Sequence, residues 1–152
     1  MKHISILGAG SIGCWVGGHL FAGGSRVTLI GRERFAKEIE SHGLKLSHFE
    51  RPDISLNDVP YVTDDNSLGD ADIIVLCTKS QDTEKAAEQI RRKAKANARI
   101  VSFQNGIRNF ETLESYLPKT MEVIPGIVPF NVTPTGQGGF HCGTAGVPAV
   151  PQ

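Results

Sequence analysis

The stretch HISILGAGSIG, His3 to Gly13, decides the fold of this 152-residue chain. An apolar run leads directly into a G-x-G-x-x-G sequence, and helical spacing continues from there to Ala22. In a strand-turn-helix unit the first glycine allows a tight turn, the second lets the backbone approach a pyrophosphate, and the third lets helix and strand pack closely. The helix N-terminus adds free N–H groups. We therefore expect a dinucleotide-binding turn, formed by Gly8, Ala9, Gly10, Ser11, Ile12 and Gly13. The alternative is a set of glycines that only permits the sharp turn.

Beyond this unit, short apolar runs alternate with segments of helical spacing. We expect strands at 26–30, 71–79, 99–106 and a buried one at 121–130, and helices at 11–22, 33–43, 83–95 and 107–117. In the first helix, Ile12, Trp15, Val16 and His19 have the spacing that places them on one face, and the third helix is expected to be capped by Asp82 and Thr83. Short hairpins are expected at 44–61 and in the glycine-rich segment 131–146. This order predicts one Rossmann-type α/β domain over 1–152, doubly wound around a mostly parallel sheet.

Composition excludes several classes of function. Sixteen basic residues balance sixteen acidic ones, so the chain lacks the positive field that attracts nucleic acid or an anionic membrane. The apolar runs are shorter than the roughly 20 residues that cross a bilayer, and the N-terminus does not resemble a signal peptide. Cys14, Cys77 and Cys142 are too few and too scattered for a disulfide framework or a metal cluster. We expect a cytoplasmic protein with reduced thiols, no metal and a small-molecule ligand.

The second strand ends in VTLIGRERF, Val27 to Phe35, which supplies Gly31 and then Arg32 where an acid is usual. An acid about 20 residues after the glycine turn normally binds the adenosine ribose. Gly31 is expected to leave room for a 2′-phosphate, and Arg32 to form charge-assisted hydrogen bonds with it, each worth about 1.5 to 3 kcal/mol. The expected cofactor is NADP(H). Glu33 leaves an alternative open, because it could pair with Arg32 or reach the ribose itself.

Two more candidate residues follow buried strands, at the sheet edge where ligands bind in this fold. Lys79, in CTKS, offers a flexible cation, and Asn105, in QNG, offers an amide that can both donate and accept. The alternatives are a solvated loop lysine and a turn residue before Gly106. After Asn105, His141 is the one side chain placed as a general acid could be, and a lone histidine in a hairpin is more often structural.

In an ordered set of motifs the chain resembles the ketopantoate reductase (2-dehydropantoate 2-reductase) family. The motifs are ILGAGSIG, GR at 31–32, CTKSQDT at 77–83, SFQNGI at 102–107 and PGIVPFNVTPTGQGGFHCGTAG at 125–146. The resemblance implies reduction of ketopantoate to pantoate with NADPH, on the route to pantothenate and coenzyme A. It also implies that Arg32 meets the 2′-phosphate, that Lys79 lines the cofactor side, and that Asn105 contacts both nicotinamide and substrate.

The chain departs from that family pattern in one respect. The family carries a catalytic lysine and a glutamate in a helical C-terminal domain, and this sequence ends before either. We therefore expect the cofactor-binding half of a reductase, inactive alone, whose partner is ketopantoate or another 2-keto acid. The oligomeric state stays open, with a homodimer as one option.

Two rival interpretations are weaker. Nucleotide-sensing regulatory domains share the glycine turn, but they usually keep an acid where this chain has Gly31-Arg32. Opine and glycerol-phosphate dehydrogenases begin similarly, but they do not explain QNG followed by GGFHCGTAG.

Overall fold

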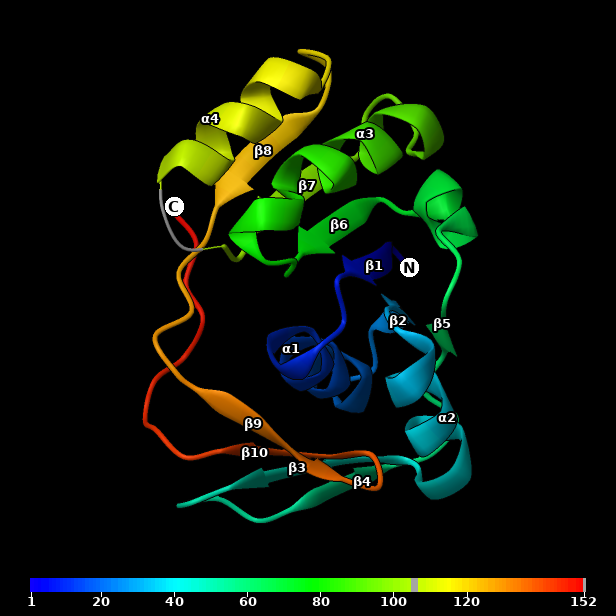
Figure 1. Cartoon of the computed structure of the whole chain (residues 1–152), viewed down its shortest axis with the longest axis vertical. Helices are drawn as coiled ribbons and strands as arrows, with labels where there is room; N and C mark the ends of the chain where they lie inside the picture. Colours follow the sequence, from blue (N-terminus) through cyan, green and yellow to red (C-terminus); the bar gives the residue numbers. More distant parts are fainter. Residues whose placement is uncertain (105–106, 152) are drawn as a thin grey trace.

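The larger of two sheets is a six-stranded parallel sheet (Figure 1). The structure is a computed structural model that describes residues 1–104 and 107–151. The strand order is β5-β2-β1-β6-β7-β8, which is the order of a Rossmann-type sheet. The strands are β1 (His3–Leu7), β2 (Arg26–Ile30), β5 (Tyr61–Val62), β6 (Ile73–Leu76), β7 (Arg99–Ser102) and β8 (Glu122–Pro125). The predicted doubly wound α/β fold is confirmed.

Helices cover both faces of this sheet, which explains the near-continuous apolar strands. On β1, Ile6 belongs to the core formed with α1 (Ser11–Ala22) and α2 (Glu33–His42). Its neighbour Leu7 points to the opposite face and belongs to the core formed with α3 (Thr83–Lys93) and α4 (Ile107–Tyr116). Two short 3-10 helices, η1 (Asn66–Asp70) and η2 (Ser80–Asp82), precede β6 and α3 respectively.

A second, four-stranded sheet packs on the other side of α1. Its order is β4-β3-β10-β9, from β3 (Leu44–His48), β4 (Ile54–Leu56), β9 (Val132–Gly136) and β10 (Gly139–Cys142). Both predicted hairpins are present, as the antiparallel pairs β3–β4 and β9–β10. The sequence did not predict that they join, through parallel pairing of β3 with β10.

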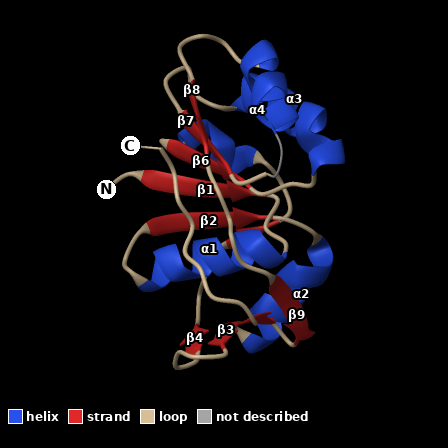
Figure 2. Cartoon of the chain, turned by 90° about the vertical axis from the view of Figure 1, so that its left-hand side faces the viewer, coloured by secondary structure: helices blue, strands red, loops and turns tan. Residues whose placement is uncertain are grey.

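The expected helix is present as α1, and it is buried on more than the face that carries Ile12, Trp15, Val16 and His19, because α1 lies between the two sheets (Figures 1 and 2). Its buried residues run all the way round the helix, from Gly13 to Gly18. A Cβ added at Gly17 would overlap Leu29 of the large sheet, and one at Gly18 would lie 2.8 Å from Leu46 Cδ1 of the small sheet. The two glycines let both sheets approach the helix backbone closely.

Two further expectations are corrected. The last strand, β8, is not buried, because it is an edge strand with one neighbour and its side chains are exposed or half-buried. Asp82 stands before α3 without a side-chain capping bond, whereas Thr83 Oγ1 lies 2.9 Å from the carbonyl oxygen of Ser80. Among the described residues, no helix combines the length and the apolar character that crossing a membrane requires.

Candidate cofactor-binding site

The first glycine of the turn is required by both its backbone and its neighbours. Gly8 has φ of 86°, in the left-handed region that favours glycine. A Cβ there would lie 2.6 Å from Thr78 Cγ2 and 2.7 Å from the Thr78 backbone nitrogen. The absence of a side chain therefore lets the turn after β1 pack against the loop after β6.

The second and third glycines differ in what surrounds them. A Cβ at Gly10 would meet nothing within 4 Å, so the fold leaves open space at this position. A Cβ at Gly13 would lie 2.9 Å from the carbonyl oxygen of Gly8, so the third glycine serves packing. Gly10 is the position where the backbone is open to a ligand, and its role in binding a pyrophosphate stays a prediction.

The start of α1 presents backbone donors beside that open space. The first intrahelical bond runs from Cys14 N–H to the carbonyl oxygen of Gly10, at 2.8 Å. The N–H groups of Ser11, Ile12 and Gly13 precede it, and such groups have no acceptor within a helix. The first turn of α1 contains no acidic residue. These three donors at the positive end of the helix dipole form a surface suited to a phosphate.

Arg32 stands at the N-cap of α2 with an exposed side chain. Its neighbour Glu33 pairs instead with Lys37, at 3.4 Å between Oε1 and Nζ. Within residues 1–104 and 107–151 no carboxylate lies at ion-pairing distance from Arg32, so the structure does not show the alternative pairing of Glu33 with Arg32. Because the N–H of Ala9 donates to the carbonyl oxygen of Ile30 at 2.8 Å, the end of β2 is tied directly to the glycine turn.

The predicted reason for Gly31 was wrong. We expected its missing side chain to leave room for a 2′-phosphate, but that space holds Tyr61. A Cβ at Gly31 would overlap the Tyr61 hydroxyl and would lie 2.9 Å from the carbonyl oxygen of Ala9. The Tyr61 hydroxyl donates to that same carbonyl oxygen at 2.6 Å. Nothing in the local sequence around Tyr61 indicated this contact.

The loops after β6 and β7 lie at the same edge of the sheet as the turn. Cys77 N–H donates to the carbonyl oxygen of Leu7, and Phe103 N–H donates to that of Leu76. Lys79 is exposed just before η2 and has no ion-pair partner in the described part of the chain. Asn105 lies outside the described residues, so its predicted role is not placed. His141 is engaged in the small sheet, where its Nδ1 lies 2.8 Å from Ser47 Oγ.

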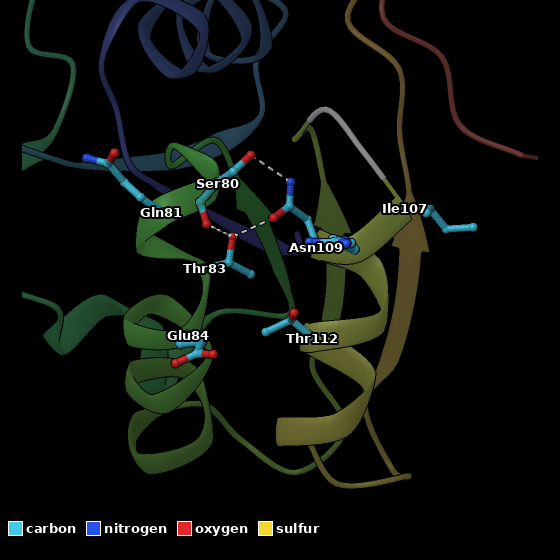
Figure 3. Close-up of a pocket in the computed structure, with 8 residues that line it drawn as sticks. Ser80, Gln81, Thr83, Glu84, Ile107, Asn109 and Thr112 are labelled. Atoms are coloured by element: carbon cyan, nitrogen blue, oxygen red, sulfur yellow. Dashed lines mark hydrogen bonds between the residues drawn. The ribbon is translucent and has the colours of Figure 1, made fainter.

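A polar network that the sequence did not reveal joins these two loops to α3 and α4, and Figure 3 shows the part of it formed by Ser80, Thr83 and Asn109. Gln104 Nε2 donates to Thr78 Oγ1 at 3.0 Å and to Thr83 Oγ1 at 2.9 Å. Thr83 Oγ1 lies 3.0 Å from Asn109 Oδ1, and Asn109 Nδ2 donates to Ser80 Oγ at 2.9 Å. The available signal was the polar character of CTKSQDT and QNG, which placed residues at strand ends without showing which side chains meet.

The network lies on one wall of a cavity of about 640 Å³ between the first turns of α3 and α4. The residues around it are Ser80, Gln81, Thr83, Glu84, Ile107, Arg108, Asn109 and Thr112. In the loop after β6, burial raises the pKa of the Cys77 thiol to about 12, so this cysteine is uncharged near neutral pH. The chemistry that the described edge can offer is therefore binding and orientation by hydrogen-bond donors and by the exposed cations Arg32, Lys79 and Arg108.

Comparison with known proteins identifies the family. The family model described as Ketopantoate reductase PanE/ApbA matches residues 4–148. The chain belongs to the ketopantoate reductase family. A 2-dehydropantoate 2-reductase of Halobacterium salinarum is 31% identical over 122 residues, which cover 76% of this chain and 38% of the relative. One of Pyrococcus abyssi is 37% identical over 106 residues, which cover 70% of this chain and 34% of the relative.

Solved structures agree. A PanE/ApbA family ketopantoate reductase from Ralstonia eutropha has a TM-score of 0.84 at 33% identity, covering 92% of this chain and 46% of that one. D-mandelate dehydrogenase with NADH and anilino(oxo)acetate has a TM-score of 0.79 at 25% identity, covering 97% of this chain and 47% of that one. This chain thus spans less than half the length of these relatives. The family membership does not favour the alternative of a nucleotide-sensing regulatory domain.

Proposed function

We propose that residues 1–152 form the cofactor-binding half of a cytoplasmic, NADPH-dependent reductase. The reaction is reduction of ketopantoate, or a related 2-keto acid, to the 2-hydroxy acid in pantothenate and coenzyme A biosynthesis. One observation carries the cofactor assignment: Arg32 follows the end of β2, which is hydrogen-bonded to the glycine turn, and its exposed side chain has no carboxylate partner in the described chain. A cation there stabilises a 2′-phosphate and offers nothing comparable to a 2′-hydroxyl.

The residues present suit a dinucleotide phosphate. The open space at Gly10 and the N–H groups at the start of α1 would hold the pyrophosphate, and Arg32 would hold the 2′-phosphate. Ala9 and Ile12 complete the turn, and Lys79 would line the cofactor side at the end of β6. When bound, the cofactor supplies the hydride. Asn105 keeps its predicted role of orienting nicotinamide and keto acid, a role that comes from the sequence and the family resemblance.

We expect the proton that the reaction needs to come from outside the described residues. Reduction of a keto acid needs a proton donor for the developing alkoxide, and His141 is already bound to Ser47. Apolar side chains are also exposed near the chain end, with Ile127 at 66% and Val147 at 61%. Ile127 and Ala149 exchange two backbone hydrogen bonds, which hold these segments side by side. Exposed apolar groups of this kind suit contact with a second domain that brings the proton donor.

Turnover tests this proposal. We expect the 152-residue chain to bind NADPH and to reduce ketopantoate negligibly, and the same chain, extended by a helical domain to the length of its relatives, to reduce it. A positioned general acid contributes on the order of 10² to 10⁴ in rate, and enclosure in a cleft contributes more. Asn105→Ala in the extended protein should lower turnover and leave the preference for NADPH intact.

Two results would contradict the proposal. Ready turnover by the short chain would show that the proton donor is already present, with Lys79 or His141 as the candidate. An extended protein that binds NADPH and reduces no 2-keto acid in a panel including ketopantoate would exclude the proposed reaction.

A further inference from the structure

We propose that Tyr61 determines cofactor specificity indirectly, by occupying the space beside Gly31 and so excluding from that position the acidic side chain that would bind an unphosphorylated ribose. This inference rests on the proposed function, because it assumes that the dinucleotide lies across the glycine turn and Arg32. It assigns Tyr61 a positioning role, with no contact to the reacting atoms.

The backbone of Tyr61 is fixed beside the end of β2. In the pairing of β5 with β2, Leu29 is opposite Tyr61 and Ile30 is opposite Val62. Leu29 N–H donates to the carbonyl oxygen of Pro60 at 2.8 Å, and Gly31 N–H donates to that of Val62 at 3.0 Å. The Tyr61 side chain therefore starts next to the end of β2 and reaches across Gly31 to the glycine turn.

The side chain is held at its far end as well. Its ring packs against the core around α1, and its hydroxyl donates to the carbonyl oxygen of Ala9 at 2.6 Å. That oxygen also lies 3.4 Å from Cys14 Sγ. Burial, with a smaller effect from Cys14, raises the pKa of the Tyr61 hydroxyl above its ordinary value, so the hydroxyl stays a donor through the neutral range.

This placement leaves no room for a side chain at position 31. A Cβ there would overlap the Tyr61 hydroxyl and would lie 2.9 Å from both Tyr61 Cζ and the carbonyl oxygen of Ala9. The Ala9 oxygen belongs to the backbone of the turn, so relief requires Tyr61 to move out of its packing. In dinucleotide-binding folds the acid at the end of the second strand binds the ribose hydroxyls of NAD. With Tyr61 in place, an acid at position 31 is excluded and Arg32, the next residue, becomes the group that contacts the adenosine ribose.

A double-mutant cycle tests this exclusion in the chain as it stands. The variants are Gly31→Asp, Tyr61→Val and the double variant, with Tyr61→Phe as the control that keeps the ring and removes the hydroxyl. Dissociation constants for NADPH and NADH are measured by calorimetry, and melting temperatures by circular dichroism. We expect Gly31→Asp alone to lower the melting temperature and to gain no affinity for NADH. In the Tyr61→Val background the same change should cost little in melting temperature and should improve NADH binding about tenfold, which corresponds to one hydrogen bond to a charged group.

Folding provides a second readout. If Gly31→Asp prevents folding, Gly31→Ala replaces it, because its single added methyl group tests the same overlap. Gly31→Ala should lower the melting temperature more in the wild type than in the Tyr61→Val background. If Gly31→Ala lowers the melting temperature equally in the wild type and in the Tyr61→Val background, the inference is overturned. A gain of NADH binding by Gly31→Asp alone would also overturn it.

The two proposals fail in different ways. If the wild type prefers NADPH and Gly31→Asp alone changes that preference, the role of Tyr61 is excluded and the proposed function stands. If the wild type binds neither cofactor, the proposed function and this inference both fall.

Discussion

The two sides of the carboxyl edge of the large sheet are built differently. On the adenosine side, glycines at 8, 13 and 31 let backbones and Tyr61 pack closely, and the elements are tied by short hydrogen bonds. On the side of β6 and β7, a side-chain network around Gln104 and Thr83 borders a cavity, and apolar residues such as Ile107 are 73% exposed. We propose from this contrast that residues of this chain alone bind the adenosine half of the cofactor, and that turnover needs a further surface.

Gly10→Val should produce the largest effect, which is a loss of cofactor binding on the adenosine side without a loss of folding. Because a Cβ at Gly10 meets nothing within 4 Å, the folded chain should tolerate the substitution, with a melting temperature near that of the wild type. The valine would occupy the space that a pyrophosphate needs, so affinity for NADPH and NADH should both fall by at least about 100-fold.

A matched control separates this effect from a general cost of replacing glycine. Gly143 is exposed, and a Cβ there would lie 3.9 Å from its nearest neighbour, His141. Gly143→Val should leave both affinities unchanged. Undiminished cofactor binding by a folded Gly10→Val variant would place the phosphate site elsewhere.

Thr83→Val should destabilise the side of β6 and β7, with an effect smaller than that of Gly10→Val. Thr83 is 2% exposed, and its hydroxyl accepts from Gln104 and lies against Asn109. Removing it leaves the buried amide of Asn109 and the half-buried amide of Gln104 without that partner, at a cost of about 1 to 3 kcal/mol in the free energy of unfolding measured with urea. Affinity for NADPH should change much less than in Gly10→Val.

Thr112→Val is the control for this change. Thr112 lines the same cavity, and its side chain makes no hydrogen bond with another described residue. Its replacement should alter the free energy of unfolding by less than about 0.5 kcal/mol. If Thr83→Val and Thr112→Val change the free energy of unfolding equally, the network does not stabilise the side of β6 and β7.

Local patterns in the sequence predicted most of the large sheet and the turn. The strand-turn-helix unit from His3 to Ala22 depends on contacts between near neighbours, so apolar spacing and glycine positions were sufficient. The left-handed Gly24 and Gly43 end α1 and α2 for the same local reason.

Features that depend on distant contacts were missed. The pairing of β3 with β10 joins two hairpins that are far apart in the chain, and each hairpin alone looks like a surface element. That pairing creates the sheet that buries the second side of α1, which the spacing of Ile12, Trp15, Val16 and His19 on one face did not indicate. The space beside Gly31 was expected to take a 2′-phosphate, but Tyr61 fills it from β5. No spacing rule in the sequence links positions 31 and 61.

The smallest expected effect lies at the opposite, amino end of the sheet. Asp72 accepts hydrogen bonds from Lys95 Nζ at 2.6 Å and from His3 N–H at 2.8 Å. The bond from Lys95, followed by the one from the backbone of His3, lowers the pKa of Asp72 from 3.8 to about 2. A carboxyl whose pKa is lower in the folded state stabilises the fold above its unfolded pKa, and this contribution disappears as pH falls from about 4 to about 2.

Asp72→Asn should therefore reduce the loss of stability across that pH interval, measured as the shift of the urea midpoint between pH 5 and pH 2. Cofactor affinity at pH 7 should not change, because Asp72 is at the end of the sheet away from the glycine turn. An unaltered pH dependence would contradict the role assigned to the Lys95 contact.

Calorimetry on the wild type and Arg32→Ala tests the central claim most directly, with Arg34→Ala as the control because Arg34 already pairs with Glu38. The account predicts that the wild type binds NADPH more tightly than NADH, and that Arg32→Ala weakens NADPH binding by about 10- to 100-fold, the value of one charge-assisted hydrogen bond. Its affinity for NADH, and both affinities of Arg34→Ala, should stay close to those of the wild type. Equal affinity of the wild type for the two cofactors, or equal weakening of both by Arg32→Ala, would contradict the assignment of Arg32 to the 2′-phosphate.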